Sequence, residues 1–360
     1  MTLFDKDPRL LVRQAEPFNG GPGPDALLSS FVTPNELFFV RNHGGVPQVD
    51  PAAWRLTVDG LVDNPLTLSL ADLRRFSRRA VGATLQCAGN RRTEMMAVSP
   101  IPNELPWGAE AISHAEWSGV PLREVLAAAG PKAGALHAAF LGLDETERHG
   151  HRFCFGGSIP LDKAFNPEVL LADTMNGAPL PPVHGAPLRV VVPGYIGARS
   201  VKWLSRITLQ EGPSDNYFQA KAYRLFPAWM GPDNVEWEKG LMLGEGPVSS
   251  AICSPLEGDR LPAGAVTARG WAVAGGNRQV ARVDVSTDGG KTWRTAELEG
   301  GERWSWAFWK TALDLYPGEH EILCRAFDTA AQTQPDHPSQ VWNFKGYANN
   351  AWHRVRVVCG

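Results

Sequence analysis

The stretch Thr84-Leu-Gln-Cys-Ala-Gly-Asn-Arg-Arg-Thr-Glu-Met95 places a thiol, Cys87, between an apolar run and a turn. Residues 81–85 predict a short strand, and the glycine and asparagine after the cysteine tolerate the positive φ of a sharp turn. Two adjacent arginines follow, and nearby cations favour the thiolate form of a cysteine. Cys87 is therefore a candidate nucleophile or soft-metal ligand, and a buried structural cysteine is the alternative.

The length, net charge and cysteine content of the chain narrow the class of protein. A chain of 360 residues exceeds the usual size of one hydrophobic core, so we expect two domains. The formal charge of -3 argues against nucleic acid or an anionic membrane as the main partner. No uncharged apolar run is long enough to span a membrane, and the first residues lack the apolar region of a signal peptide. Five scattered cysteines without a CxxC pair favour a reducing compartment, so we predict a cytoplasmic protein.

The expected domains are residues 1–240 and 241–360. From residue 248 onward, short alternating runs are separated by glycine-rich turns, as in 281–285 before Asp288-Gly-Gly290. This pattern predicts an all-β sandwich of immunoglobulin-like type. The first domain mixes helical and strand patterns, so the predicted fold class is α+β.

Within the first domain, residues 1–35 read as an extended arm, and 37–40 as a buried strand that ends in polar side chains. Pro121 and Gly130 bracket a predicted helix over 122–129. Residues 136–143 predict a strand, followed by a polar loop over 145–152. Residues 213–226 read as an aromatic loop.

Polar side chains gather at the predicted loop edges, and cations are in excess among them: Arg41, His43, Cys87, Arg92, Asp144, His184, Arg189, Arg199 and Lys202. Such a set predicts a pocket for a large anionic ligand with a thiolate near its reactive centre. Neither GxGxxG nor GxxxxGK[ST] occurs, so the usual nucleotide-binding loops are absent. A zinc site and Cys–His proteolysis stay open, with less support, because no paired ligand spacing accompanies Cys87.

Several long motifs, in order, resemble the sulfite oxidase family of molybdenum enzymes. They are Phe-Phe-Val-Arg-Asn-His at 38–43, Leu-Gln-Cys-Ala-Gly-Asn-Arg-Arg at 85–92, Leu-Pro-Trp at 105–107, and the segment from His184 to Leu204. The resemblance runs from about residue 30 to the end. It implies a molybdenum ion held by a pyranopterin, that is molybdopterin, and a C-terminal dimerisation domain.

The resemblance also implies roles position by position. Cys87 falls on the cysteine that ligates molybdenum. The pterin and its phosphate would be held by Phe39, Val40, Arg41, Asn42, His43, Cys87, Asp144, His184, Arg189, Ser200, Val201 and Lys202. The catalytic positions would be Arg41, Arg92, Trp107, Tyr223 and Lys345.

Two positions depart from the family pattern. Lys345 stands where sulfite-oxidising members carry arginine and assimilatory nitrate reductases carry methionine, so a cation is kept but its bidentate fork is lost. A lysine that often precedes Leu-Pro-Trp is replaced by Asn103 and Glu104. The implied activity is oxidation of sulfite to sulfate by oxygen-atom transfer, with electrons passed to a separate cytochrome or to dioxygen. The alternatives are a nitrate or sulfoxide reductase and, in another class, a non-catalytic β-rich binding protein.

Overall fold

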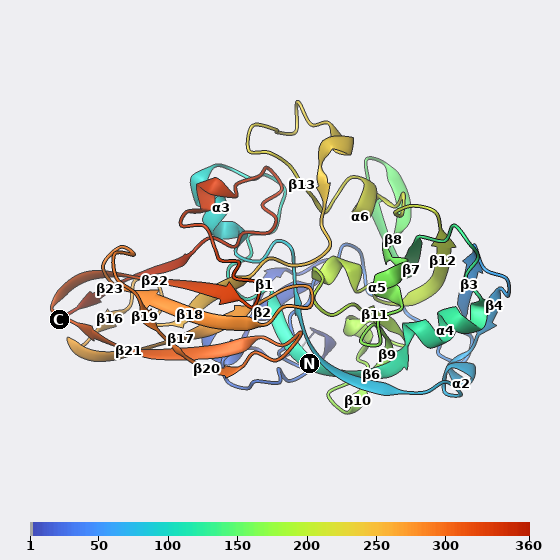
Figure 1. Ribbon diagram of the computed structural model, residues 1–360, viewed down its shortest axis with the longest axis horizontal. Helices are drawn as coiled ribbons and strands as arrows, with labels where there is room; N and C mark the ends of the chain where they lie inside the picture. The colour runs from blue at the N-terminus through green and yellow to red at the C-terminus, as the bar shows by residue number, and fades with distance from the viewer. Residues whose placement is uncertain (1–2) are drawn as a thin grey trace.

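The computed structural model describes residues 3–360 and has two parts lying end to end (Figure 1). The N-terminal part combines small sheets with short helices, and the C-terminal part is a sandwich of strands. Five tryptophans, distributed over both parts, are fully buried: Trp107, Trp117, Trp203, Trp271 and Trp306. Large apolar side chains therefore fill the cores of both parts. Among residues 3–360, no helix is long and apolar enough to cross a membrane.

Two five-stranded sheets organise the N-terminal part. The first has the order β10-β9-β6-β5, with β11 also pairing with β9. Its strands are β5 (Arg79–Gln86), β6 (Ile112–Pro121), β9 (Leu170–Met175), β10 (Ala178–Pro179) and β11 (Arg189–Val191). The second has the order β4-β3-β12-β7-β8. Its strands are β3 (Leu56–Gly60), β4 (Leu66–Leu68), β7 (His137–Arg148), β8 (His151–Pro160) and β12 (Leu204–Gln210), with β12 parallel to β3.

The helices of this part are short, and local sequence explains their ends. In α2 (Leu70–Leu73), Ser69 and Asp72 form a capping box. Helix α4 (Leu122–Ala129) follows Pro121 and ends at Gly130 in the left-handed region, as predicted. The remaining elements are η1 (Leu3–Asp5), α1 (Pro24–Leu27), α3 (Arg92–Val98), α5 (Leu161–Ala164), η2 (Pro182–His184), η3 (Gly197–Arg199), α6 (Tyr217–Ala220) and η4 (Trp237–Lys239).

The C-terminal part packs two sheets around one core. One has the order β15-β17-β21-β20 and the other β16-β23-β22-β18-β19. Their strands are β15 (Ser249–Ser254), β16 (Arg260–Leu261), β17 (Gly264–Val273), β18 (Val280–Ser286), β19 (Arg294–Thr295), β20 (Glu297–Gly300), β21 (Ala307–Leu315), β22 (Gly318–Asp328) and β23 (His353–Cys359). The helix η5 (Pro338–Gln340) precedes a long segment that returns to the N-terminal part. Alternating burial along β21 matches the two-residue period that predicted a sandwich.

Four local predictions were wrong. Residues 1–35 contain the hairpin β1 (Leu10–Gln14) and β2 (Asn19–Pro22) and the helix α1. Residues 37–40 are buried but form no strand beyond a single bridge between Val40 and Gly20. The supposed loop 145–152 is mostly the end of β7 and the start of β8, which pair as a hairpin. The segment 213–226 contains α6 and β13 (Arg224–Leu225), which pairs with β14 (Leu241–Met242).

Candidate active site

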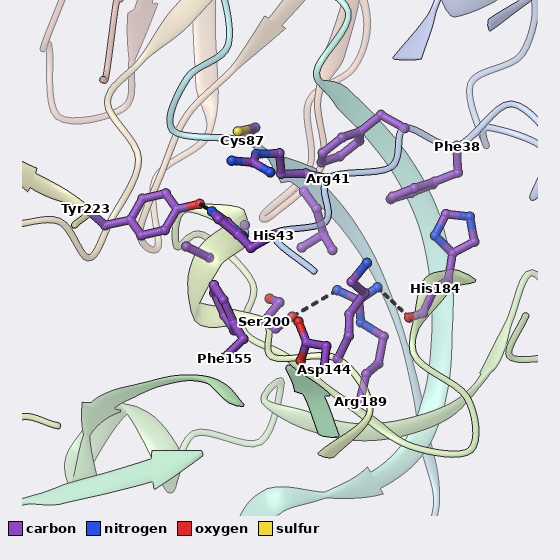
Figure 2. Close-up of a pocket in the computed structure, with 15 residues that line it drawn as sticks. Phe38, Arg41, His43, Cys87, Asp144, Phe155, His184, Arg189, Ser200 and Tyr223 are labelled. Atoms are coloured by element: carbon purple, nitrogen blue, oxygen red, sulfur yellow. Dashed lines mark hydrogen bonds between the residues drawn. The ribbon is translucent and has the colours of Figure 1, made fainter. Parts of the chain in front are cut away.

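A cleft lies where the 38–43 segment, the turn after β5 and the loop before β12 meet (Figure 2). Ten of the predicted site residues line it: Phe39, Arg41, His43, Cys87, Asp144, His184, Arg189, Ser200, Lys202 and Tyr223. These residues come from segments far apart in the chain, and the fold brings them to one place. The cleft is therefore the candidate active site.

Cys87 sits at the end of β5, where the strand gives way to a turn. Its backbone N–H donates to the carbonyl of Ala111 at 2.9 Å, and the N–H of Gly89 points at its Sγ at 3.4 Å. A Cβ on Gly89 would overlap the guanidinium of Arg92, so only glycine allows that cation to lie against the turn. Figure 2 shows the thiol on the same side of the cleft as Arg41. Cys87 thus lines the same cleft as Arg41, at a turn packed against Arg92, and a cysteine sulfur is a suitable ligand for a soft metal.

The opposite wall of the cleft is strongly basic. The guanidinium of Arg189 donates to the carbonyls of His184 and Ser200, at 2.9 and 3.1 Å, and burial lowers the pKa of Arg189 to about 9. Lys202 donates to Asn42 and to the carbonyl of Val183, and burial lowers its pKa as well. Cations that are buried without a matching set of carboxylates call for an anion. A phosphate is such an anion.

Asp144 supplies the carboxylate of this wall. Burial raises the pKa of Asp144 to about 7, against the opposing effect of Lys202. Its Oδ1 is buried and has no hydrogen-bond partner among the described residues. An unpaired buried acceptor is costly unless a ligand donates to it. The N–H groups of a pterin ring are suitable donors.

Two histidines flank the cleft in their neutral form. Burial, followed by the nearby cations, lowers the pKa of His43 and of His184 well below the usual range. Tyr223 places its phenolic oxygen 3.0 Å from Nε2 of His43. The backbone of Tyr223 has φ of 54°, a left-handed value that is unusual for an aromatic residue. Strain of this kind gathers at functional sites, where packing holds the residue in place.

Three other predicted cofactor residues stand behind the cleft without lining it. The backbone of Val40 forms hydrogen bonds with the backbone of Gly20, and the backbone carbonyl of Val201 accepts a hydrogen bond from the N–H of Val190. The side chain of Asn42 donates to the carbonyl of Phe18 and accepts from Lys202. These contacts fix the cleft wall.

The other three predicted catalytic residues lie beyond Cys87. Trp107 is fully buried in one apolar cluster with Cys87, and its Nε1 has no partner among the described residues. Arg92 donates to the carbonyls of Leu105, Lys345 and Gly346. The ammonium of Lys345 forms an ion pair with Glu104. Arg92 and Lys345 therefore lie together, but neither borders the cleft directly.

Sequence reasoning missed part of the lining: Phe38, Leu85, Phe155, Gly197 and Ala198. Phe38 and Leu85 lie inside quoted motifs, and Gly197 and Ala198 lie inside the quoted segment from His184 to Leu204, so proximity to motif residues was their one signal. A Cβ on Gly197 would come within 3.1 Å of the carbonyl of Gln86, beside Cys87. Phe155 carries no such signal, because it looks like an ordinary apolar residue of β8.

The donor set fits the expected cofactor. The cleft offers one thiol, a basic wall for a phosphate and an unpaired carboxylate oxygen for ring N–H groups. Among residues 3–360, no three His, Cys, Asp or Glu side chains group as a metal site of their own. A molybdopterin brings its own sulfur ligands, so a single protein thiol is enough to complete its attachment.

Comparisons with known proteins agree with this reading. Residues 43–218 match the oxidoreductase molybdopterin binding domain, and residues 242–359 match the Mo-co oxidoreductase dimerisation domain. The chain is 45% identical to sulfite oxidase of Gallus gallus over 97% of this chain and 78% of the relative. It is 43% identical to mitochondrial sulfite oxidase of Homo sapiens over 98% of this chain, and it spans 66% of that relative.

A solved structure gives the same result. The crystal structure of the sulfane dehydrogenase SoxCD from Paracoccus pantotrophus superposes with a TM-score of 0.80, at 29% identity. The match covers 94% of this chain and 83% of that one. The predicted α+β fold, a molybdopterin-binding domain followed by a dimerisation domain, is confirmed. The chain belongs to the sulfite oxidase family and is a molybdenum oxidoreductase whose cofactor is molybdopterin.

Proposed function

We propose that this protein oxidises sulfite to sulfate, using water as the source of the added oxygen and releasing two electrons and two protons. The observation that carries the proposal is the cleft itself. It brings Cys87 and Arg41 together with a basic wall, in a chain with 45% identity to a sulfite oxidase. The two electrons leave to a separate acceptor, a cytochrome or dioxygen, as the resemblance implies.

The cofactor would be held at three points. Cys87 supplies the protein ligand to molybdenum, Arg189 and Lys202 bind the phosphate, and Asp144 accepts from the pterin ring. Phe39, His43, His184 and Ser200 complete the surroundings, with Val40, Asn42 and Val201 supporting them. The bound cofactor supplies the oxygen-atom transfer and accepts the electron pair. The protein contributes binding, orientation and charge.

The substrate would approach on the Cys87 side. Arg41 lines the cleft there. Arg92 and Lys345 do not line it but approach it through Tyr347, which stacks on the lining residue Tyr223, and Trp107 packs in one cluster with Cys87. Cations fix an oxyanion by charge-assisted hydrogen bonds. Burial raises the pKa of Tyr223, so its hydroxyl stays protonated and can donate to the bound anion or to His43.

We also propose a homodimer formed through the C-terminal sandwich, which we assign to residues 241–360 and to an immunoglobulin-like type. The match of 242–359 to a dimerisation domain supports this. Sedimentation at micromolar protein is expected to give twice the chain mass of 39.2 kDa. A single 39.2 kDa species would contradict the dimer. All five cysteines are free thiols, which supports a reducing compartment such as the cytoplasm.

One comparison tests the activity and the direction of electron flow together. Protein made in a host that synthesises the cofactor is assayed with sulfite and an oxidising dye, and with nitrate and methionine sulfoxide and a reducing dye. We expect turnover with sulfite and little with the other two. Preferential reduction of nitrate or the sulfoxide would overturn the proposal. Protein lacking stoichiometric molybdenum and pterin fluorescence would favour a non-catalytic role.

A further inference from the structure

A carboxylate occupies the place between two of the proposed substrate-binding cations. Glu104 forms an ion pair with the ammonium of Lys345, and its Oε2 lies 3.6 Å from Nη2 of Arg92. All three side chains are sheltered, with 14, 20 and 3% of the Glu104, Lys345 and Arg92 side chains exposed. Water therefore screens these charges weakly, and their interaction is stronger than that of a surface ion pair.

This cluster, Arg92, Glu104 and Lys345, adjoins the cleft through two stacked tyrosines. The guanidinium of Arg92 lies 5.4 Å from the ring centre of Tyr347, and Tyr347 stacks on Tyr223 with ring centres 5.1 Å apart. Tyr223 lines the cleft. After burial, the charge of Glu104 is among the causes that raise the pKa of both tyrosines. The negative charge of Glu104 therefore acts on Tyr223, a residue that lines the candidate active site.

We propose that Glu104 is a specificity-determining residue, an internal anion that neutralises one of the two charges of the Arg92–Lys345 site and must release Lys345 before an oxyanion binds there. The inference rests on the proposed function. With Glu104 in place, the cluster carries one net positive charge instead of two. Repulsion from the carboxylate doubles when the arriving anion carries two charges. Glu104 therefore weakens the binding of doubly charged sulfate more than the binding of singly charged hydrogensulfite, and so favours release of the product.

A purely structural role would have Glu104 serve only as the counter-ion that holds Arg92. Yet Arg92 is already held by three backbone carbonyls, of Leu105, Lys345 and Gly346, at 2.8 to 3.2 Å. Its position does not depend on the longer contact with Glu104. Removing the charge of Glu104 is therefore expected to leave the fold intact and to free Lys345 for a ligand.

The test measures anion binding to the oxidised, cofactor-loaded protein by titration calorimetry. The probes are sulfate, with two charges, and methanesulfonate, with one. In Glu104→Gln the Kd of sulfate is expected to fall about tenfold, and that of methanesulfonate about threefold or less, because the repulsion scales with ligand charge. Glu236→Gln, which removes the carboxylate of an exposed pair with Lys239, is the matched control and should change neither Kd.

Two further measurements complete the test: sulfate binding in a Lys345→Met background, and sulfite turnover. In a Lys345→Met background, Glu104→Gln should tighten sulfate binding much less, because the competition acts through Lys345. An unchanged or weaker sulfate Kd in folded Glu104→Gln overturns the inference. If Glu104→Gln does not fold, Glu104→Ala replaces it, and failure of both makes Glu104 a structural counter-ion. Sulfite turnover is measured separately, so tighter sulfate binding without sulfite oxidation refutes the proposed function and leaves this inference standing.

Discussion

The phenolic oxygen of Tyr223 lies 3.0 Å from Nε2 of His43, and burial keeps both groups uncharged. Between a protonated tyrosine and a neutral histidine, the hydroxyl donates to Nε2 in one imidazole tautomer and accepts from the Nε2–H in the other. The pair therefore joins a residue of the cofactor wall to the substrate side of the cleft. It offers a short path along which a proton can leave the reacting centre.

Replacing Tyr223 by Phe should remove this path while keeping the ring. We expect kcat/KM for sulfite to fall about 100-fold, the lower end of what a positioned proton donor or acceptor contributes. Steady-state kinetics measure the loss. Tyr217→Phe is a matched control, because Tyr217 packs against Phe218 at 5.3 Å and lies outside the cleft lining. Equal kinetics for the two variants would remove Tyr223 from catalysis.

Replacing Cys87 by Ser should abolish turnover without unfolding the protein, because a hydroxyl is nearly isosteric with the thiol but is a poor soft-metal ligand. The loss should exceed about 100-fold, the upper range for removing a group that merely supports a metal ligand. Turnover, molybdenum content and circular dichroism are measured together. Cys154→Ser, at a half-buried thiol outside the cleft, should keep full activity. Retained activity in Cys87→Ser would disprove the ligand assignment.

Some parts of the site could be predicted from the sequence, and others could not. Cys87, Arg189 and Lys202 were predictable because each sits inside a contiguous motif whose local turn or strand also places it. The contact between Glu104 and Lys345 joins residues far apart in sequence, and no local pattern marks it. The hairpin of β7 and β8 was missed for another reason. Its outer end, Glu145 to Arg152, is polar on both faces, so the usual alternation is absent.

Arg91, the neighbour of Arg92 in the sequence, connects the two domains. Its side chain is fully buried, pairs with Glu94 at 2.6 Å and donates to the carbonyl of Ser250 at 2.9 Å. Arg91→Met leaves the carboxylate and the carbonyl without their donor, so we expect a loss of about 3–5 kcal/mol in the free energy of unfolding. Urea denaturation measures it. Arg206→Met, at an exposed pair with Asp59, should cost at most about 1 kcal/mol.

If Arg91→Met and Arg206→Met cost the same, the buried pair does not stabilise the domain contact. The double variant Arg91→Met/Glu94→Met is expected to recover part of the loss, because it removes the stranded carboxylate together with the guanidinium. No recovery would mean that the carbonyl of Ser250, and not Glu94, is the partner that matters.

Lys6 connects the N-terminal segment to the cleft. Its ammonium donates to the carbonyls of Asn35 and Phe38, at 2.6 and 2.9 Å, and lies 2.6 Å from Nε2 of His184. While Lys6 is protonated its ammonium can only donate, so Nε2 accepts and the proton of the neutral imidazole lies on Nδ1. Burial lowers the pKa of Lys6 to about 7, against an opposing effect of Glu36.

This shift has a definite sign for stability. An unfolded lysine keeps a pKa of 10.5, so between pH 7 and 10.5 the unfolded chain binds more protons at Lys6 than the folded chain does. The free energy of unfolding therefore rises with pH across this window, by at most about 1.4 kcal/mol per pH unit. Lys6→Met should lose this rise, whereas Lys132→Met, at an exposed lysine, should keep it. Urea denaturation of the cofactor-loaded proteins at several pH values between 7.5 and 9.5 gives the difference between variant and parent. Curves for Lys6→Met and the parent that run parallel across this range would show that Lys6 is not the group that titrates, because every other ionisable residue is common to both proteins.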